Sequence, residues 1–95
     1  MIGGLAIGAA IGTGLRKLFG EAKAVRAEEA AAEGGILLMH IRQQFEQEKG
    51  RPMTAAETKK LFNTYEQGLA ELGFEQQPGT RAWFRPRSAI ETFLG

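Results

Sequence analysis

The sequence predicts a mainly α protein whose C-terminal part is a small helix–hairpin–short helix module. Three observations predict this class: an apolar, glycine-rich opening segment, a long stretch rich in good helix formers, and two Ser/Thr-x-x-Glu capping patterns further on. The 95 residues suffice for one small domain. We expect residues 1–15 to form an apolar glycine-zipper helix, 16–50 a long helical segment with a hinge, and 51–95 a small α+β hairpin docking module.

The first helix is predicted from the stretch GGLAIGAAIG, in which Gly4, Gly8 and Gly12 recur at every fourth position. On a helical wheel these glycines form a shallow groove beside Ile7 and Ile11, and the helix has no polar face. Each glycine costs about 1 kcal/mol relative to alanine, so the helix needs support from outside itself. Glycine at this spacing lets a second helix approach closely. We expect these five residues to form a helix-packing face, with a free Gly/Ala tail as the alternative.

A secretion signal and a membrane span are two further interpretations of this segment. A secretion signal has its basic residues before the apolar stretch, whereas Arg16 and Lys17 follow it here, so we reject that interpretation. As a helix the fifteen uncharged residues are about 22 Å long, against a hydrocarbon core of about 30 Å. A span is therefore not the default. Membrane contact through residues 1–19, at a bacterial inner membrane, stays open as an alternative.

Residues 16–50 are predicted to be helical because helix formers dominate and small or apolar residues recur at three- and four-residue spacing. The stripes before and after Gly34-Gly35 are out of register, which predicts a hinge at 34–35, either a kink or a break. The stretch RAEEAAAEGG carries a thin alanine face that suits a close neighbour. An ordinary solvated helix is an equally good interpretation of it.

The helix at the start of the last segment has the clearest predicted boundaries. The sequence GRP at residues 50–52 ends the preceding helix, and TAAE, from Thr54 to Glu57, has the capping-box pattern that begins the next one. Gly73 is expected to end this helix in the left-handed conformation. Phe74 then supplies the hydrophobic contact of a Schellman motif.

A hairpin and a last helical turn are predicted to follow. Pro78-Gly79 supplies the central pair of a type II turn, in a loop wider than two residues because this turn twists poorly for a tight hairpin. SAIE at residues 88–91 is a second capping box and predicts the short helix. The predicted core consists of Leu38, Ile41, Phe45, Leu61, Phe62, Tyr65, Leu69, Phe74, Phe84, Ile90 and Phe93.

No catalytic constellation is present in the sequence, so we expect no enzymatic activity, no cofactor and no metal site. The chain has no Cys and no Asp, and His40 is its only histidine, interpreted as a boundary residue of a helix. It contains no P-loop, HExxH or GxSxG pattern. Twelve Lys and Arg balance eleven Glu, so overall charge gives no argument for nucleic acid.

The hairpin with Arg81, Trp83, Arg85 and Arg87 nevertheless suggests a winged-helix-like arrangement. In it the arginines would contact phosphates and Trp83 a sugar or base. The preceding helix carries Glu as well as Lys, and the chain lacks the high pI typical of such modules. We therefore do not expect nucleic acid as the partner, and instead expect these four residues to contact a neighbouring subunit.

The stretch MIGGLAIGAAIGTGLRKLFG, followed by an Ala/Glu/Gln-rich helix, resembles the N-termini of phage DNA-ejection and pilot proteins. The resemblance covers about the first 33 residues and is compositional. It implies a homo-oligomeric virion protein that contacts other copies of itself and neighbouring portal, tail or internal core proteins. The leading hypothesis is a non-enzymatic structural component of such a multi-copy assembly. A small membrane-anchored helical protein and a winged-helix-like nucleic-acid-binding module are the alternatives.

Overall fold

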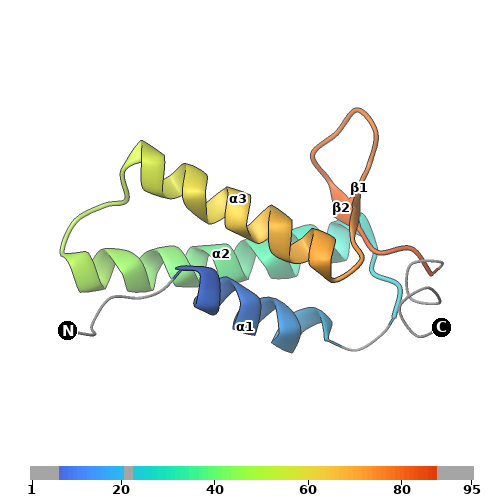
Figure 1. The fold of residues 1–95 in the computed structure, drawn as a ribbon, viewed down its shortest axis with the longest axis horizontal. Helices are drawn as coiled ribbons and strands as arrows, with labels where there is room; N and C mark the ends of the chain where they lie inside the picture. Colours follow the sequence, from blue (N-terminus) through green and yellow to red (C-terminus); the bar gives the residue numbers. More distant parts are fainter. Residues whose placement is uncertain (1–6, 21–22, 88–95) are drawn as a thin grey trace.

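The computed structural model describes residues 7–20 and 23–87, which form three helices and a two-stranded antiparallel sheet. In chain order the elements are α1 (Ile7–Phe19), α2 (Ala27–Lys49), α3 (Ala55–Glu71), β1 (Glu75–Gln76) and β2 (Trp83–Phe84) (Figure 1). The shorter α1 packs against both longer helices, and the hairpin lies at the end of α3. The mainly helical class predicted from the sequence, with its small hairpin, is confirmed.

A single core is shared by all three helices. Each helix contributes an apolar stripe that recurs at three- or four-residue spacing, as a helix with one buried face requires. The buried apolar residues are Ile7, Ile11, Leu15, Phe19, Val25, Ala30, Ile41, Phe45, Met53, Leu61, Tyr65, Leu69 and Phe74. The opening helix was expected to need support from outside itself, and for Ile7–Phe19 that support comes from α2 and α3 of the same chain, which cover its apolar side.

Two glycines let α1 come close to the other helices. A Cβ at Gly14 of α1 would overlap the side chain of Leu37 on α2. A Cβ at Gly68 of α3 would lie 2.5 Å from Leu15 Cδ1 on α1, closer than real Cβ contacts allow. Both glycines therefore accommodate a large side chain of the facing helix, and they are not the glycines that the four-residue spacing singles out.

Gly34 has the same role between α2 and α3, because a Cβ there would overlap the hydroxyl of Tyr65. The helix α2 runs through Gly34 and Gly35 as one element, so of the two outcomes predicted at 34–35, a kink or a break, the break is excluded. Glycine lowers helix propensity but keeps its backbone hydrogen bonds, and the packing of Tyr65 against Gly34 stabilises the continuous helix. The chain leaves the helix instead between α1 and α2, so the segment predicted from residue 16 begins at Ala27.

The predicted start of α3 is confirmed. Thr54 is its N-cap: the Thr54 hydroxyl accepts a hydrogen bond from the Glu57 N–H at 3.1 Å, and the Thr54 N–H donates to Glu57 Oε1 at 2.9 Å. Arg51 also donates to both oxygens of the Glu57 carboxylate. The hydrogen bond from Arg51, followed by that from the Thr54 N–H, lowers the pKa of Glu57 to about 2.

The predicted end of α3 is confirmed as well. Gly73 has φ +89°, and its N–H donates to Ala70 O at 3.1 Å. The N–H of Phe74 donates to Leu69 O at 3.0 Å, and the side chains of both residues are buried. These two bonds are the pair that defines a Schellman motif.

The hairpin is joined to the segment between α1 and α2. In the hairpin itself β1 pairs with β2, with Gln76 opposite Trp83, around a wide loop in which Gly79 has φ +76° as predicted. Beyond β2, Arg85 pairs with Val25 through two backbone hydrogen bonds of 2.9 and 3.0 Å. The linker at Val25 is thereby held against the hairpin.

Some predicted features lie outside the described residues. These are Gly4, the capping box at 88–91, and the predicted core residues Ile90 and Phe93. Among the other predicted core residues, Phe62 is 49% exposed and its prediction is corrected. It lies at the flank of the buried stripe of α3 and not on it.

Candidate functional site

Two surfaces of the protein contain residues that the sequence analysis singled out: the solvent side of α1 and the hairpin end of α3. Across residues 7–20 and 23–87, no group of three His, Cys, Asp or Glu side chains could hold a metal ion. Within the same residues no helix combines the length and the apolar character that a membrane crossing requires.

The outer face of α1 consists of Gly8, Ala9, Gly12 and Thr13. Gly8, Ala9 and Thr13 are exposed and Gly12 is half-buried. A Cβ at Gly8 or at Gly12 would meet no atom of a described residue within 4 Å. These two glycines are therefore open toward solvent, whereas the glycines that accommodate other helices face inward.

The predicted helix-packing face is divided by the structure. Ile7 and Ile11 are 9% and 1% exposed and belong to the protein's own core. These two side chains pack in the core that α1 shares with α2 and α3 of the same chain, so they are not available to a helix of another chain. Among the described residues of the predicted face, Gly8 and Gly12 are the ones that remain open at the surface.

Arg85 is 4% exposed, which corrects the prediction that it contacts a partner or nucleic acid. Its Nε donates to Lys23 O at 2.9 Å and its Nη1 donates to Leu72 O at 3.3 Å. The guanidinium lies 5.1 Å from the ring centroid of Phe74, and burial lowers the pKa of Arg85. A planar guanidinium can satisfy two carbonyl oxygens and stack on a ring at once, so this arginine is held inside and joins linker, helix end and hairpin.

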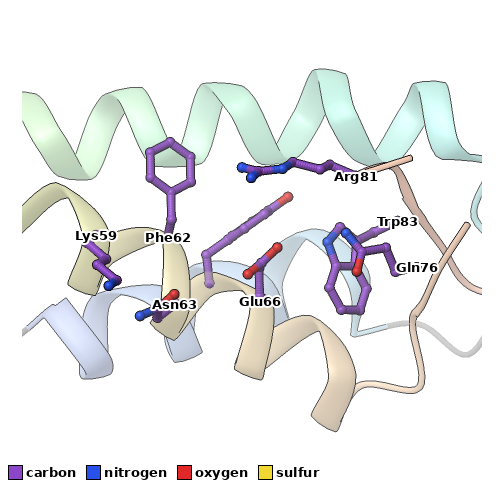
Figure 2. A pocket seen from close by; sticks show the side chains of 8 residues that line it. Lys59, Phe62, Asn63, Glu66, Gln76, Arg81 and Trp83 are labelled. Carbon is purple, nitrogen blue, oxygen red and sulfur yellow. The ribbon is translucent and has the colours of Figure 1, made fainter. Parts of the chain in front are cut away.

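Next to the hairpin lies a groove of about 710 Å³, which we call the aromatic groove (Figure 2). Five of its residues are on α3 and three come from the hairpin. They are Lys59, Phe62, Asn63, Tyr65, Glu66, Gln76, Arg81 and Trp83.

Figure 2 shows Phe62 pointing from α3 toward α2, and Arg81 extending from the hairpin loop across the groove toward it. Trp83 lies at the hairpin end, and Lys59 marks the opposite end. Of the four predicted contact residues, the groove thus brings together Arg81 and Trp83. Arg87 is exposed but does not line it.

Sequence reasoning missed the part of the groove that belongs to α3. Counted from Lys59, the residues Phe62, Asn63 and Glu66 lie three, four and seven positions further along the helix. All four side chains therefore share one face of α3. This pattern was present in the sequence. Its meaning depends on the hairpin, which lies beside the same face only in the folded chain.

Comparison with protein-family models, curated proteins and solved structures finds no match for this chain. The function has to be inferred from the outer face of α1 and from the aromatic groove.

Proposed function

We propose that the protein is a non-enzymatic structural component of a multi-copy assembly, in which the outer face of α1 packs against a neighbouring subunit. The open space around Gly8 and Gly12 carries this proposal. Glycine costs about 1 kcal/mol relative to alanine inside a helix. Gly14 on the same helix offsets that cost by accommodating Leu37, whereas a side chain at Gly8 or Gly12 would meet none of the described residues.

The polarity of α1 supports the same proposal. From Ile7 to Leu15 the helix carries no charged side chain, and its first cations are Arg16 and Lys17. These cations lie in the last turn, where they complement the helix dipole. A second helix can therefore approach the outer face at the short distance that glycine permits, without removing a charge from water.

The compositional resemblance of the first 33 or so residues favours one kind of assembly. A phage virion, with portal, tail or internal core proteins as neighbours, is the assembly that it favours. The nucleic-acid alternative loses support because Arg85 bonds to backbone carbonyls of its own chain. Membrane contact is kept as an outcome of the following test.

The test is to replace Gly8 and Gly12 together with glutamine and to measure the molar mass in solution by light scattering. Glutamine is a good helix former, so the free energy of unfolding is expected to rise by about 1–2 kcal/mol. Its bulk blocks close approach, so the molar mass is expected to fall from a multiple of 10.3 kDa to that of one chain. Gly35→Gln is the matched control, since Gly35 is an exposed helical glycine with equally open space.

The control is expected to stabilise the fold and to leave the molar mass unchanged. The proposal is contradicted if the double variant keeps the molar mass of the assembly. It is also contradicted if the unaltered protein is a single chain at every concentration measured. A single chain that cosediments with phospholipid vesicles would support the membrane alternative instead.

A further inference from the structure

The aromatic groove is lined by three rings, of which that of Phe62 is the most exposed. Phe62 is 49% exposed, and Tyr65 and Trp83 lie beside it with most of their surface covered. An aromatic side chain exposed to this extent gains free energy when a partner covers it. The volume of about 710 Å³ is in the range of sites that bind small molecules or short peptide segments.

The polar side chains of the groove are not used by the fold. Among the described residues, Lys59, Glu66 and Arg81 form no ion pair with one another or with any other side chain. The amides of Asn63 and Gln76 likewise make no hydrogen bond to a described residue. Two cations, one carboxylate and two amides are therefore free to bind a ligand.

This set of groups favours a peptide over a polyanion. A primary amide offers a donor and an acceptor together, which matches the N–H and C=O of an extended backbone. Lys59, at one end of the groove, and Arg81, which extends across it toward Phe62, complement carboxylates. Glu66 lies between Lys59 and Trp83 and repels consecutive phosphates, whereas a peptide can place an N–H or an uncharged side chain against it.

We propose that the aromatic groove binds an extended peptide segment of a partner protein, with a large apolar or aromatic side chain between two acidic residues. The apolar side chain packs against Phe62 and Trp83, and the acidic residues pair with Lys59 and Arg81. This site is separate from the outer face of α1 and does not depend on it.

Trp83 gives a direct test, because it is the only tryptophan in the chain and it lines the groove. The probe is the capped peptide acetyl-Glu-Phe-Leu-Glu-amide, titrated into the full chain while Trp83 fluorescence is recorded. We expect a saturable change with a dissociation constant of about 1 mM or lower. The same peptide with Lys in place of both Glu is expected to bind at least about tenfold more weakly.

Variants locate the site. Arg81→Glu is expected to weaken binding of the acidic peptide about tenfold or more, as is Lys59→Glu. Their matched controls are Arg87→Glu and Lys60→Glu, which make the same charge change at exposed residues outside the groove. Circular dichroism verifies that each variant keeps its helix content. An octamer of deoxythymidine, titrated in the same way, tests whether the groove binds a polyanion. It is expected to bind more weakly than the acidic peptide.

Several results would overturn the peptide proposal. One is the absence of any fluorescence change with the acidic peptide; another is equal binding of the acidic and basic peptides. Tighter binding of the oligonucleotide would assign the groove to single-stranded nucleic acid instead. Equal effects of Lys59→Glu and Lys60→Glu would move the site away from the groove.

Discussion

Replacing Phe19 with alanine is expected to lower the free energy of unfolding by about 3–5 kcal/mol. Phe19 is 1% exposed, and its ring meets that of Phe74 edge-on at a centroid distance of 5.0 Å. The substitution removes the apolar surface that α1 buries at its C-terminal end and leaves a cavity beside Phe74. A domain of this size has a total stability of about 5–10 kcal/mol, so the variant would retain little of it.

Urea unfolding followed by circular dichroism measures this loss, and Lys17→Ala is the control. Lys17 is exposed on the same helix, so its replacement is expected to change the free energy of unfolding by no more than about 0.5 kcal/mol. If Phe19→Ala were as mild as Lys17→Ala, α1 would not be part of the core.

Replacing Arg85 with methionine is expected to lower the free energy of unfolding by about 2–4 kcal/mol. Methionine retains an unbranched apolar stem but leaves Lys23 O and Leu72 O without the donors that Arg85 supplies. Each lost hydrogen bond to a charged group costs about 1.5–3 kcal/mol, and part of this is offset because the carbonyls can reach water. The contact of the guanidinium with the Phe74 ring is lost as well.

Lysine at position 85 separates the charge of the side chain from its shape. A single ammonium cannot reach both carbonyls and stack on Phe74, so Arg85→Lys is expected to recover less than half of the loss. Arg87→Met is the exposed control and should be nearly neutral. Urea unfolding is again the measurement. Full recovery with lysine would show that charge alone, and not the geometry of the guanidinium, stabilises this junction.

The parts of the fold that were predicted correctly depend on short-range chemistry. Thr54 and Glu57 satisfy each other's N–H groups within one helical turn, and Gly73 adopts a conformation that favours glycine locally. The turn at Pro78-Gly79 has the same character. Such signals lie within a few residues of the feature they specify, so a single sequence is enough to find them.

The features that were missed depend on residues far apart in the chain. From its neighbours in the sequence, Gly34 could either break a helix or make room for a side chain of another helix. Only its contact with Tyr65 on α3 distinguishes these two roles. Arg85 looks like a surface cation until Lys23 and Leu72 are brought beside it. Hydrophobic periodicity and propensity contain no information about which helices meet, so these roles could not be predicted from the sequence.

The same limit applied to the candidate sites. The spacing of Gly8 and Gly12 was visible in the sequence, but the side on which Ile7 and Ile11 are covered was not. For the aromatic groove, Arg81 and Trp83 were found because they lie in the predicted hairpin. Their neighbours on α3 required the folded chain.

The central claim is that α1 is a helix of the protein's own core, covered by α2 and α3 of the same chain. Amide hydrogen exchange of residues 11–19, measured at a dilution at which the protein is a single chain, tests this claim most directly. We expect protection of these amides comparable to that of Leu61 to Leu69 in α3, because both helices would open only with the core. Exchange of residues 11–19 at the rate of an unfolded chain, while α3 stays protected, would contradict it.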